Sequence, residues 1–399
     1  MSLKRGKFCA DILWFRRDLR TDDNPILSKG GGYVLPVFIF DKDILKRLKR
    51  DDPRVTYIFE SVKNLKRELK LVGLDLLVFY GRPSDVFGYL SSLLCIRNIY
   101  AVSDNDLYSK KRDYEIGKRF RLNLINDAFL IQPEKVFSKD GKVYTVFSHF
   151  RNAVADSIMR RSYEKYIPET GNRIPPGIDY DRIIAVEDSS ASYLPFEIES
   201  IGFVIRKSSY IGSVAETNSM LNNLEAVIRD YEKKRDIPSL DATSHLGCAL
   251  RFGRVSVREV VRRALRVRDS SAFINELIWR EFFSYLLFHF PESEKNNFKN
   301  IQVRWKDNRK LYERWKSGET GIPFVDAGMR QLLREGFIHN RVRMIVAGFL
   351  TKNLHIRWQS GEEYFAEMLM DYEISSNTGN WQWVSGTGAD PKSLYRTFN

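Results

Sequence analysis

Ser375-Ser376-Asn377-Thr378-Gly379-Asn380-Trp381-Gln382-Trp383 is the most informative stretch of this sequence. Two indoles stand two residues apart and follow a run of small polar residues. A buried Trp needs a partner for its N–H group, and Asn, Thr and Gly favour turns that leave the backbone exposed. We therefore expect a pocket wall that holds something flat and aromatic. A packed Trp pair at a helix start is the alternative, and this run alone supports both interpretations about equally.

The composition sets limits on the class of protein. The chain has 399 residues, which suggests two or three domains, and 43% of them are hydrophobic, which is enough for real cores. No apolar run reaches the roughly 18 residues that a membrane span needs. The start of the chain, residues 1–7, is charged and has no apolar stretch behind it, so we expect no secretory signal.

Charge and cysteine content indicate the setting. The net charge of +13 favours a polyanionic partner, with nucleic acid the natural candidate and an anionic membrane surface the alternative. Aromatic residues, at 13%, add flat faces on which bases can stack. Cys9, Cys95 and Cys248 are far apart and have no metal-ligand spacing. They fit a reducing, cytoplasmic setting without disulfides, and we predict no metal site.

The N-terminal third alternates between two kinds of segment. Continuous apolar runs predict buried strands, and helical spacing of apolar residues predicts helices between them. The strands are expected at 10–15, 33–40, 74–80 and 97–103, and the helices at 55–72, 84–94 and 108–122. This alternation is typical of a parallel sheet. We predict an α/β, Rossmann-like domain over residues 8–135.

The remainder of the chain divides into two parts. Residues 136–215 are rich in Pro, Ser and Gly with weak periodicity, which predicts an inter-domain linker on the surface. From residue 216 to 399 the pattern is helical almost throughout and predicts an all-α domain. Its amphipathic stretches are 219–231, 255–268, 272–290, 324–335 and 341–355.

One of these helical stretches carries a polar and aromatic face. Glu276, Trp279 and Arg280 stand at i, i+3 and i+4 and share one side of the helix. Taken alone, this segment is better explained as a Glu–Arg surface pair beside a packed Trp. The functional interpretation is the lining of a cavity.

Further polar residues lie near apolar ones toward the C-terminus. Asn340, Arg343 and Met344 fall on one helix side, and arginines at the edge of an apolar cavity suit phosphates or a charged cofactor. Asp371 and Glu373 have the spacing of an acid/base pair, but no histidine or nucleophile accompanies them. The pattern therefore indicates chemistry that a bound cofactor performs.

Several long stretches, in the same order, resemble the signatures of the photolyase/cryptochrome family. They are Leu13-Trp14-Phe15-Arg16-Arg17-Asp18-Leu19-Arg20 with Asp23-Asn24, Asn275-Glu276-Leu277-Ile278-Trp279-Arg280-Glu281-Phe282, Gly321-Ile322-Pro323-Phe324-Val325-Asp326-Ala327-Gly328-Met329-Arg330, His339-Asn340-Arg341, and Asn377 through Trp383. The resemblance covers nearly the whole chain and is strongest to microbial cyclobutane pyrimidine dimer photolyases. Met344 after Arg343 fits that branch, because members acting on the 6-4 photoproduct tend to have a histidine near this position.

The resemblance implies the photolyase fold, in which the helical domain holds a U-shaped FAD that is active when reduced. The residues implied in FAD binding are Tyr231, Thr243, Ser244, His245, Leu246, Gly247, Arg280, Arg343, Asp371, Tyr372, Glu373 and Asn377. Arg343 and Asp371 are expected to form an ion pair over the isoalloxazine, and Asn377 is expected beside flavin N5. The chain departs from the family at two positions, because members often have Arg in place of His245 and Ser in place of Gly247. One charge and one hydroxyl are then missing, and we expect either weaker FAD binding or compensation by another residue.

The resemblance also implies roles for the tryptophans and for residues that meet the DNA lesion. Trp381, Trp358 and Trp305 match an electron-transfer chain, although three core tryptophans are the simpler interpretation without the motifs. Residues implied in binding DNA or its lesion are Arg235, Glu276, Trp279, Asn340, Arg341 and Trp383, and those implied in catalysis are Glu276, Asn340, Met344 and Asn377.

The implied activity is that of a deoxyribodipyrimidine photo-lyase, a carbon–carbon lyase that repairs UV-damaged DNA. Photoexcited reduced FAD donates an electron to a cyclobutane pyrimidine dimer, the ring opens and the electron returns. The alternatives are a 6-4 photolyase and a cryptochrome blue-light photoreceptor. We expect a monomer with no membrane and no obligate protein partner. A second, antenna chromophore is common in the family, but Asp106, where folate-binding members tend to have Glu, does not identify it. Relatives continue for another helix or two beyond Tyr395–Asn399, so we expect a short C-terminal end.

Overall fold

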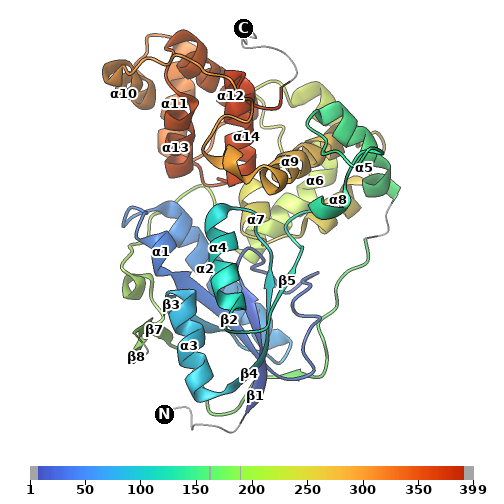
Figure 1. Cartoon of the computed structure of the whole chain (residues 1–399), viewed down its shortest axis with the longest axis vertical. Coiled ribbons are helices and arrows are strands. Elements are labelled where there is room, and N and C mark those ends of the chain that lie inside the picture. The colour runs from blue at the N-terminus through green and yellow to red at the C-terminus, as the bar shows by residue number, and fades with distance from the viewer. Residues whose placement is uncertain (1–7, 161–162, 189, 391–399) are drawn as a thin grey trace. The chain divides into compact units, whose positions relative to one another are not determined.

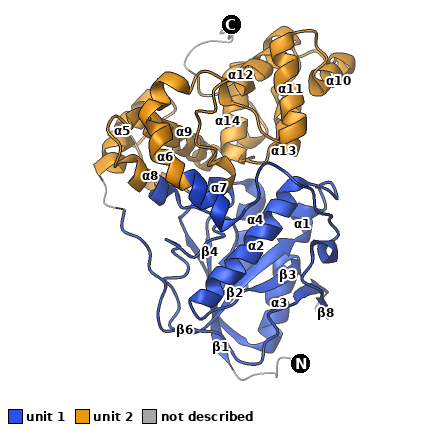
Figure 2. Cartoon of the chain, turned by 180° about the vertical axis from the view of Figure 1, so that it is seen from behind, with its two compact units in different colours: residues 1–128, 163–220, 249–260 blue, residues 129–162, 221–248, 261–399 orange. Residues whose placement is uncertain are grey.

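The computed structural model describes residues 8–160, 163–188 and 190–390. The expectation about the C-terminal end falls on residues 391–399 and lies outside this part of the chain. Figure 2 shows two compact units, each assembled from three pieces of chain. Unit 1 comprises residues 1–128, 163–220 and 249–260, and unit 2 comprises residues 129–162, 221–248 and 261–399. Among the described residues, no helix has the length and apolar character that crossing a membrane requires.

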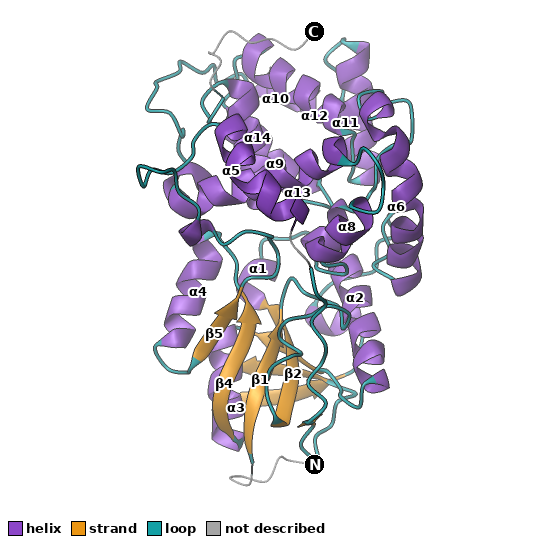
Figure 3. Cartoon of the chain, turned by 90° about the vertical axis from the view of Figure 1, so that its right-hand side faces the viewer, coloured by secondary structure: helices purple, strands orange, loops and turns teal. Residues whose placement is uncertain are grey.

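Unit 1 is built on a sheet that has eight strands in the described part of the chain (Figures 1 and 3). The strands are β1 (Cys9–Phe15), β2 (Gly32–Asp41), β3 (Leu77–Gly81), β4 (Cys95–Val102), β5 (Leu122–Ile125), β6 (Asn172–Arg173), β7 (Ile183–Glu187) and β8 (Ser190–Leu194). Their order is β5-β4-β1-β2-β3-β7-β8, with β6 on β2, and every pair is parallel except β7 with β8. The predicted α/β class is confirmed.

Helices alternate with the central strands, as the sequence predicts. They are α1 (Lys42–Leu45), α2 (Pro53–Leu71), α3 (Pro83–Leu93) and α4 (Leu107–Gly117), with a short 3-10 turn at Ile198–Ile201. The start of α2 has a local cause: the Asp52 side chain accepts a hydrogen bond from the Arg54 N–H, and Pro53 occupies the first turn. Four predicted strands and three predicted helices are therefore confirmed, with ends shifted by a few residues.

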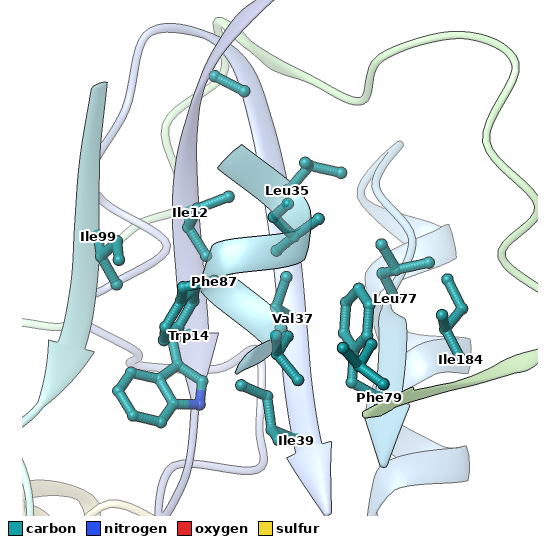
Figure 4. Packing of buried hydrophobic residues seen from close by; sticks show 14 of the residues in the cluster. Ile12, Trp14, Leu35, Val37, Ile39, Leu77, Phe79, Phe87, Ile99 and Ile184 are labelled. Atoms are coloured by element: carbon teal, nitrogen blue, oxygen red, sulfur yellow. The ribbon is translucent and has the colours of Figure 1, made fainter. Parts of the chain in front are cut away.

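The core of this sheet explains why its strands read as continuous apolar runs. Ile12, Val37 and Phe79 have no exposed surface, and Figure 4 shows them with Trp14 and Phe87 in one packed cluster. Trp14 and Phe87 meet edge to face with ring centroids 5.0 Å apart. Strands buried on both faces lose the polar–apolar alternation of exposed strands.

The polar residues of the N-terminal signature form a buried network within unit 1. Arg20 donates to both oxygens of Asp127 at 2.8 and 2.9 Å, and Arg258 donates to Asp127 at 2.8 Å. Arg258 also contacts Asp23 at 3.2 Å, and the Ser256 hydroxyl donates to Asp23 at 2.5 Å. Buried charges need such pairing. Several charged residues of the motif therefore stabilise the fold of unit 1.

Unit 2 is helical, as predicted. Its helices are α5 (Phe147–Arg160), α9 (Ser271–His289), α10 (Arg309–Ser317), α11 (Pro323–Glu335), α12 (Asn340–Gly348), a π-helical turn η4 (Phe349–Asn353), α13 (Trp358–Met368) and α14 (Ile374–Ser385), with 3-10 turns at Pro133–Lys135 and Pro291–Glu294. Helices α6 (Val214–Lys234), α7 (Gly247–Arg251) and α8 (Val257–Ala264) each include residues of both units. Trp315, Trp358 and Trp381 are all buried in the main core of unit 2.

Part of the segment predicted as a linker forms regular structure. Helix α5 begins at Phe147 and buries Phe150, Val154 and Ile158, which stand at helical spacing. Strands β7 and β8 extend the sheet of unit 1 beyond β3. The segment 136–215, predicted as a surface linker, therefore contains helix and strand as well as irregular chain.

Candidate active site

The stretch at 375–383 lies within helix α14. Glu373 caps the helix and accepts hydrogen bonds from the N–H groups of Ser375 at 3.2 Å and Ser376 at 2.9 Å. Both serine hydroxyls also donate to Glu373, at 2.5 and 2.9 Å. The cap satisfies backbone groups that a helix start otherwise leaves open, and this lets weak helix formers adopt a helix.

Two glycines let neighbouring helices come close to this region. A Cβ at Gly379 would lie 2.2 Å from the Phe283 ring on α9, and a Cβ at Gly361 on α13 would lie 2.2 Å from the Trp381 ring. Trp381 is 2% exposed and packs edge to face on Phe365, with centroids 5.0 Å apart. The small residues of the stretch therefore serve close packing and hold Trp381 in place.

A cavity in unit 2 lies along α12, α13 and α14 and has about 540 Å³ of space, part of it open to solvent. It brings together eight of the residues that sequence reasoning selected. These are Asn340, Arg343, Met344, Asp371, Tyr372, Glu373, Asn377 and Trp381. Apolar side chains line it as well, among them Ala347, Phe365, Leu369 and Val384. Aromatic and apolar walls with a few placed polar groups are typical of a site for a small organic molecule.

The charged part of this cavity is the pair formed by Arg343 and Asp371. Arg343 Nη2 donates to the two Asp371 oxygens at 2.9 and 3.1 Å, and Arg343 Nε donates to the Ile338 carbonyl at 2.9 Å. A Cβ at Gly247 would lie 2.8 Å from Asp371 Oδ2, so the backbone of residue 247 lies directly against this carboxylate. A side chain at position 247 would displace Asp371.

Asn377 is held by a residue that the sequence did not single out. Its Nδ2 donates to Glu362 Oε1 at 3.0 Å and to the Glu362 carbonyl at 3.2 Å, and the Tyr372 hydroxyl donates to the same carboxylate at 3.2 Å. Burial raises the pKa of Glu362, while the hydrogen bonds from Asn377 and Tyr372 lower it. With Nδ2 committed to Glu362, the Asn377 Oδ1 remains as the acceptor at the cavity.

Other predicted cofactor residues lie outside the lining of this cavity. His245 has a left-handed backbone with φ of +53°, and its ring lies 5.2 Å from the ring of Phe337. Thr243, Ser244 and Leu246 precede Gly247 and lead the chain toward Asp371. Burial raises the pKa of Tyr231 to about 12, and its ring meets Phe273 edge to face at 5.2 Å.

Arg280 also lies elsewhere in unit 2. Its guanidinium stands over the Phe129 ring, 4.5 Å from the centroid, and 3.8 Å from Glu281 Oε1. A cation over an aromatic face is a stable arrangement in itself. The structure thus places Arg280 in the packing between α9 and residue 129.

Residues predicted to meet DNA form a second group on α9, α12 and α14 and directly after the end of α6. Trp279 and Trp383 are perpendicular, with centroids 5.1 Å apart and planes at 88°. Arg235 forms an ion pair with Glu276. Arg341 Nε donates to Asp236 Oδ1 at 2.8 Å.

Two further features belong to this group. Asn340 Nδ2 lies 3.8 Å from Met344 Sδ, so the two side chains are neighbours on α12. Burial raises the pKa of Glu276, and the adjacent Arg235 lowers it. The group combines flat hydrophobic surfaces, cations and a half-buried carboxylate.

Two family models match the chain. The one described as the FAD binding domain of DNA photolyase matches residues 273–399, and the one described as DNA photolyase matches residues 11–169. A deoxyribodipyrimidine photo-lyase of Alkalihalophilus pseudofirmus is 34% identical over 97% of this chain and 82% of its own length. This chain belongs to the DNA photolyase family.

Solved structures of photolyases agree over nearly the whole length. A bacterial class III photolyase from Agrobacterium tumefaciens has a TM-score of 0.84 at 29% identity, covering 99% of this chain and 83% of that one. An archaeal photolyase from Sulfolobus tokodaii with two FAD molecules has a TM-score of 0.77 at 29% identity, covering 98% of this chain and 85% of that one. The chain therefore has the photolyase fold.

The tryptophans of this photolyase-family chain include one that sequence reasoning missed. Trp381 and Trp358 belong to the core of unit 2, Trp305 is partly buried against it, and Trp358 Nε1 donates to Asn297 Oδ1 at 2.8 Å. Trp315 is fully buried, with its centroid 6.2 Å from that of Trp381. An amphipathic pattern around residues 309–317 was the signal that could have shown Trp315 to be buried.

Proposed function

We propose that this chain is a light-dependent DNA repair enzyme, a deoxyribodipyrimidine photo-lyase that splits cyclobutane pyrimidine dimers. The observation that carries the proposal is the cavity of unit 2, which is lined by five residues selected for FAD binding, by Trp381 of the electron-transfer chain, and by Asn340 and Met344. Membership of the photolyase family supports it independently. Among the described residues that line the cavity, Ser376 has no histidine or cysteine beside it, and the expected chemistry is that of a bound cofactor.

The residues present fit FAD. The Gly247 backbone lies against Asp371 without a side chain between them, and Arg343 and Asp371 form a polar pair beside apolar walls. Residues that would hold FAD are Tyr231, Thr243, Ser244, His245, Leu246, Gly247, Arg280, Arg343, Asp371, Tyr372, Glu373 and Asn377. When bound and reduced, FAD supplies a light-driven electron donor. The Arg343 guanidinium offsets negative charge in the cavity.

Asn377 has one defined role in this arrangement. Because its Nδ2 donates to Glu362, its Oδ1 is presented as an acceptor and suits a ring N–H group. Glu362 is thus a positioning residue that fixes which way the amide points. The amide oxygen would accept a hydrogen bond from a protonated flavin N5, and this would favour the reduced form.

Trp381 is proposed as the first donor that restores the reduced cofactor, followed by Trp358 and Trp305. Trp381 lines the cavity and is 2% exposed. Few water molecules therefore have to reorient when the indole loses an electron. Trp305 is only partly buried, which suits the end of a path where the positive charge meets water. Trp315 also lies beside Trp381 and is a second indole next to the proposed first donor.

The residues on α9 and α14 are proposed to receive the dimer, which photolyases extrude from the duplex. Trp279 and Trp383 present perpendicular surfaces, and stacking of a base on an aromatic side chain is worth roughly 1–3 kcal/mol. Glu276 and Asn340 would hydrogen-bond the dimer and stabilise the charge that develops on its carbonyl groups. Met344 would contact its apolar face.

Arg235 and Arg341 would contact phosphates, and in this structure each is paired with a carboxylate, Glu276 and Asp236 respectively. DNA phosphates would compete with those carboxylates for the two guanidinium groups. The net charge of +13 supports general affinity for DNA. We further propose a monomer that acts in the cytoplasm with no obligate protein partner. A second chromophore is proposed by analogy with the archaeal photolyase that holds two FAD molecules.

The test is repair of a defined lesion. Purified protein, reduced in the dark, is mixed with an oligonucleotide that carries one cyclobutane thymine dimer and is then exposed to blue light. Recovery of thymine absorbance in the light but not in the dark is the expected result. A parallel oligonucleotide with a 6-4 photoproduct distinguishes the 6-4 photolyase. Flavin binding without repair of either lesion would contradict the proposal and favour a photoreceptor.

A further inference from the structure

Phe147, the first residue of α5, has the closest aromatic contact to Trp279 among the described ring pairs. Its ring lies flat on the indole, with centroids 3.4 Å apart and planes only 5° from parallel. The other rings around Trp279 are more distant: Trp383 at 5.1 Å, Phe283 at 5.7 Å and Phe282 at 5.9 Å. One face of the indole is therefore covered at van der Waals distance by a residue from a different helix.

Phe147 is itself held in place by contacts to α9. Its ring meets Phe282 edge to face at 5.6 Å. Three residues later, Phe150 has no exposed surface and packs on Phe282 at 5.3 Å and on Tyr285 at 4.9 Å. The start of α5 is thus fixed against the same helix that carries Trp279.

The chain that leads into α5 is also tied to α9. The Tyr285 hydroxyl donates to the Val136 carbonyl at 2.8 Å and accepts from the Tyr144 N–H at 3.1 Å. These two bonds fix the ends of the segment from 136 to 144, just before Phe147. Phe147 therefore does not depend on a free loop for its position.

We propose that Phe147 is a positioning residue that fixes the plane of the Trp279 indole for recognition of the extruded dimer. The inference rests on the proposed function and names a residue that the lesion need not touch. A base gains stacking energy only when the ring plane is correctly oriented. With Phe147 on one face and Trp383 perpendicular to it, the indole has one defined orientation before DNA binds. Preorganisation of this kind improves binding because less conformational entropy is lost when the DNA binds.

The simpler explanation is that Phe147 only fills space. The two explanations differ in which replacements restore function. A space-filling role is satisfied by Leu, which has similar apolar volume but no ring. A role in fixing the plane needs a flat ring, so Tyr should restore function and Leu should not.

The experiment compares Phe147→Ala, Phe147→Leu and Phe147→Tyr with the wild type. Phe137→Ala is the matched control, because Phe137 belongs to the same connecting segment, is 42% exposed and packs on His289 at 5.3 Å. Dissociation constants are measured in the dark for a dimer-containing oligonucleotide and for its undamaged counterpart. Repair per absorbed photon is measured at saturating DNA.

We expect Phe147→Ala and Phe147→Leu to weaken binding of the dimer by about threefold to tenfold, the range of an aromatic pair contact. Binding of undamaged DNA and repair per photon at saturation should not change. Phe147→Tyr and Phe137→Ala should match the wild type. Full rescue by Leu, or equal loss for damaged and undamaged DNA, would overturn the inference. A wild type with no light-dependent repair would instead contradict the proposed function itself.

Discussion

Replacement of Glu281 by Gln is predicted to change how the stability of unit 2 depends on pH. Glu281 lies on α9 and is fully buried. Its Oε2 accepts from the N–H groups of Leu130 at 2.9 Å and Ile131 at 3.1 Å. Within the described part of the chain, its Oε1 has no hydrogen-bond partner, and Arg280 Nη1 lies 3.8 Å away. The site therefore stabilises a carboxylic acid better than a carboxylate.

The size of the effect on the free energy of unfolding follows from the shift in the pKa of Glu281. Burial raises the pKa of Glu281 from 4.5 to about 7, against the opposing effects of Arg280 and the two backbone N–H groups. One pKa unit corresponds to about 1.4 kcal/mol, so the shift corresponds to about 3 kcal/mol. The folded state binds the proton more tightly than the unfolded state. This contribution is complete below pH 4.5 and is lost as the pH rises through 7.

Glutamine is neutral at every pH and can still accept both N–H bonds. The free energy of unfolding of Glu281→Gln, minus that of the wild type, should therefore increase by about 3 kcal/mol between pH 4.5 and pH 8. Urea unfolding followed by Trp fluorescence suits the measurement, because six of the seven tryptophans belong to unit 2. Glu232→Gln, at an exposed position of α6, is the control and should give a constant difference. A constant difference for Glu281→Gln, or a decrease with pH, would refute the reasoning.

Three further predictions concern the site and its partner. Gly361→Ala should lower the free energy of unfolding by roughly 1–3 kcal/mol, because its Cβ would lie 2.2 Å from the Trp381 ring; an unchanged urea midpoint would contradict the close packing of α13 and α14. Trp381→Phe should retain FAD but slow its reduction by light at least about tenfold, since a phenyl ring is a poorer donor than an indole; equal rates in flavin absorbance would exclude Trp381 as the first donor. Raising salt from about 50 to 200 mM should weaken dimer-DNA binding by at least about tenfold in filter binding; a flat response would argue against phosphate contacts by Arg235 and Arg341.

The sequence predicted the fold well where the apolar pattern was long. Strands β1, β2 and β3 are almost wholly buried, and their continuous apolar runs left little ambiguity. It failed for β7 and β8, which are five residues each, and β8 is mostly exposed. Such a strand exists because a partner provides its hydrogen bonds, and neither its length nor its composition reveals that partner.

The site was predictable in part for a similar reason. Motifs supplied residues such as Asn377, Arg343 and Asp371, and the cavity brings these three together. They did not supply Glu362, which acts through Asn377 from another helix. They also did not supply the cap made by Glu373, which turns a stretch of turn-forming residues into α14. Both depend on contacts between residues that the pattern of one segment cannot show.

The two departures from the family at His245 and Gly247 have different consequences. The Gly247 departure has a local explanation, because a Cβ there would lie 2.8 Å from Asp371 Oδ2 and 3.0 Å from its Cβ. A side chain at this position would push Asp371 and disturb its bonds to Arg343. His245 has a different setting: its Nε2 pairs with Asp241, a residue that is itself exposed. An effect of the departures on FAD binding should therefore be sought at His245: we predict that His245→Arg tightens FAD binding and that Gly247→Ser does not.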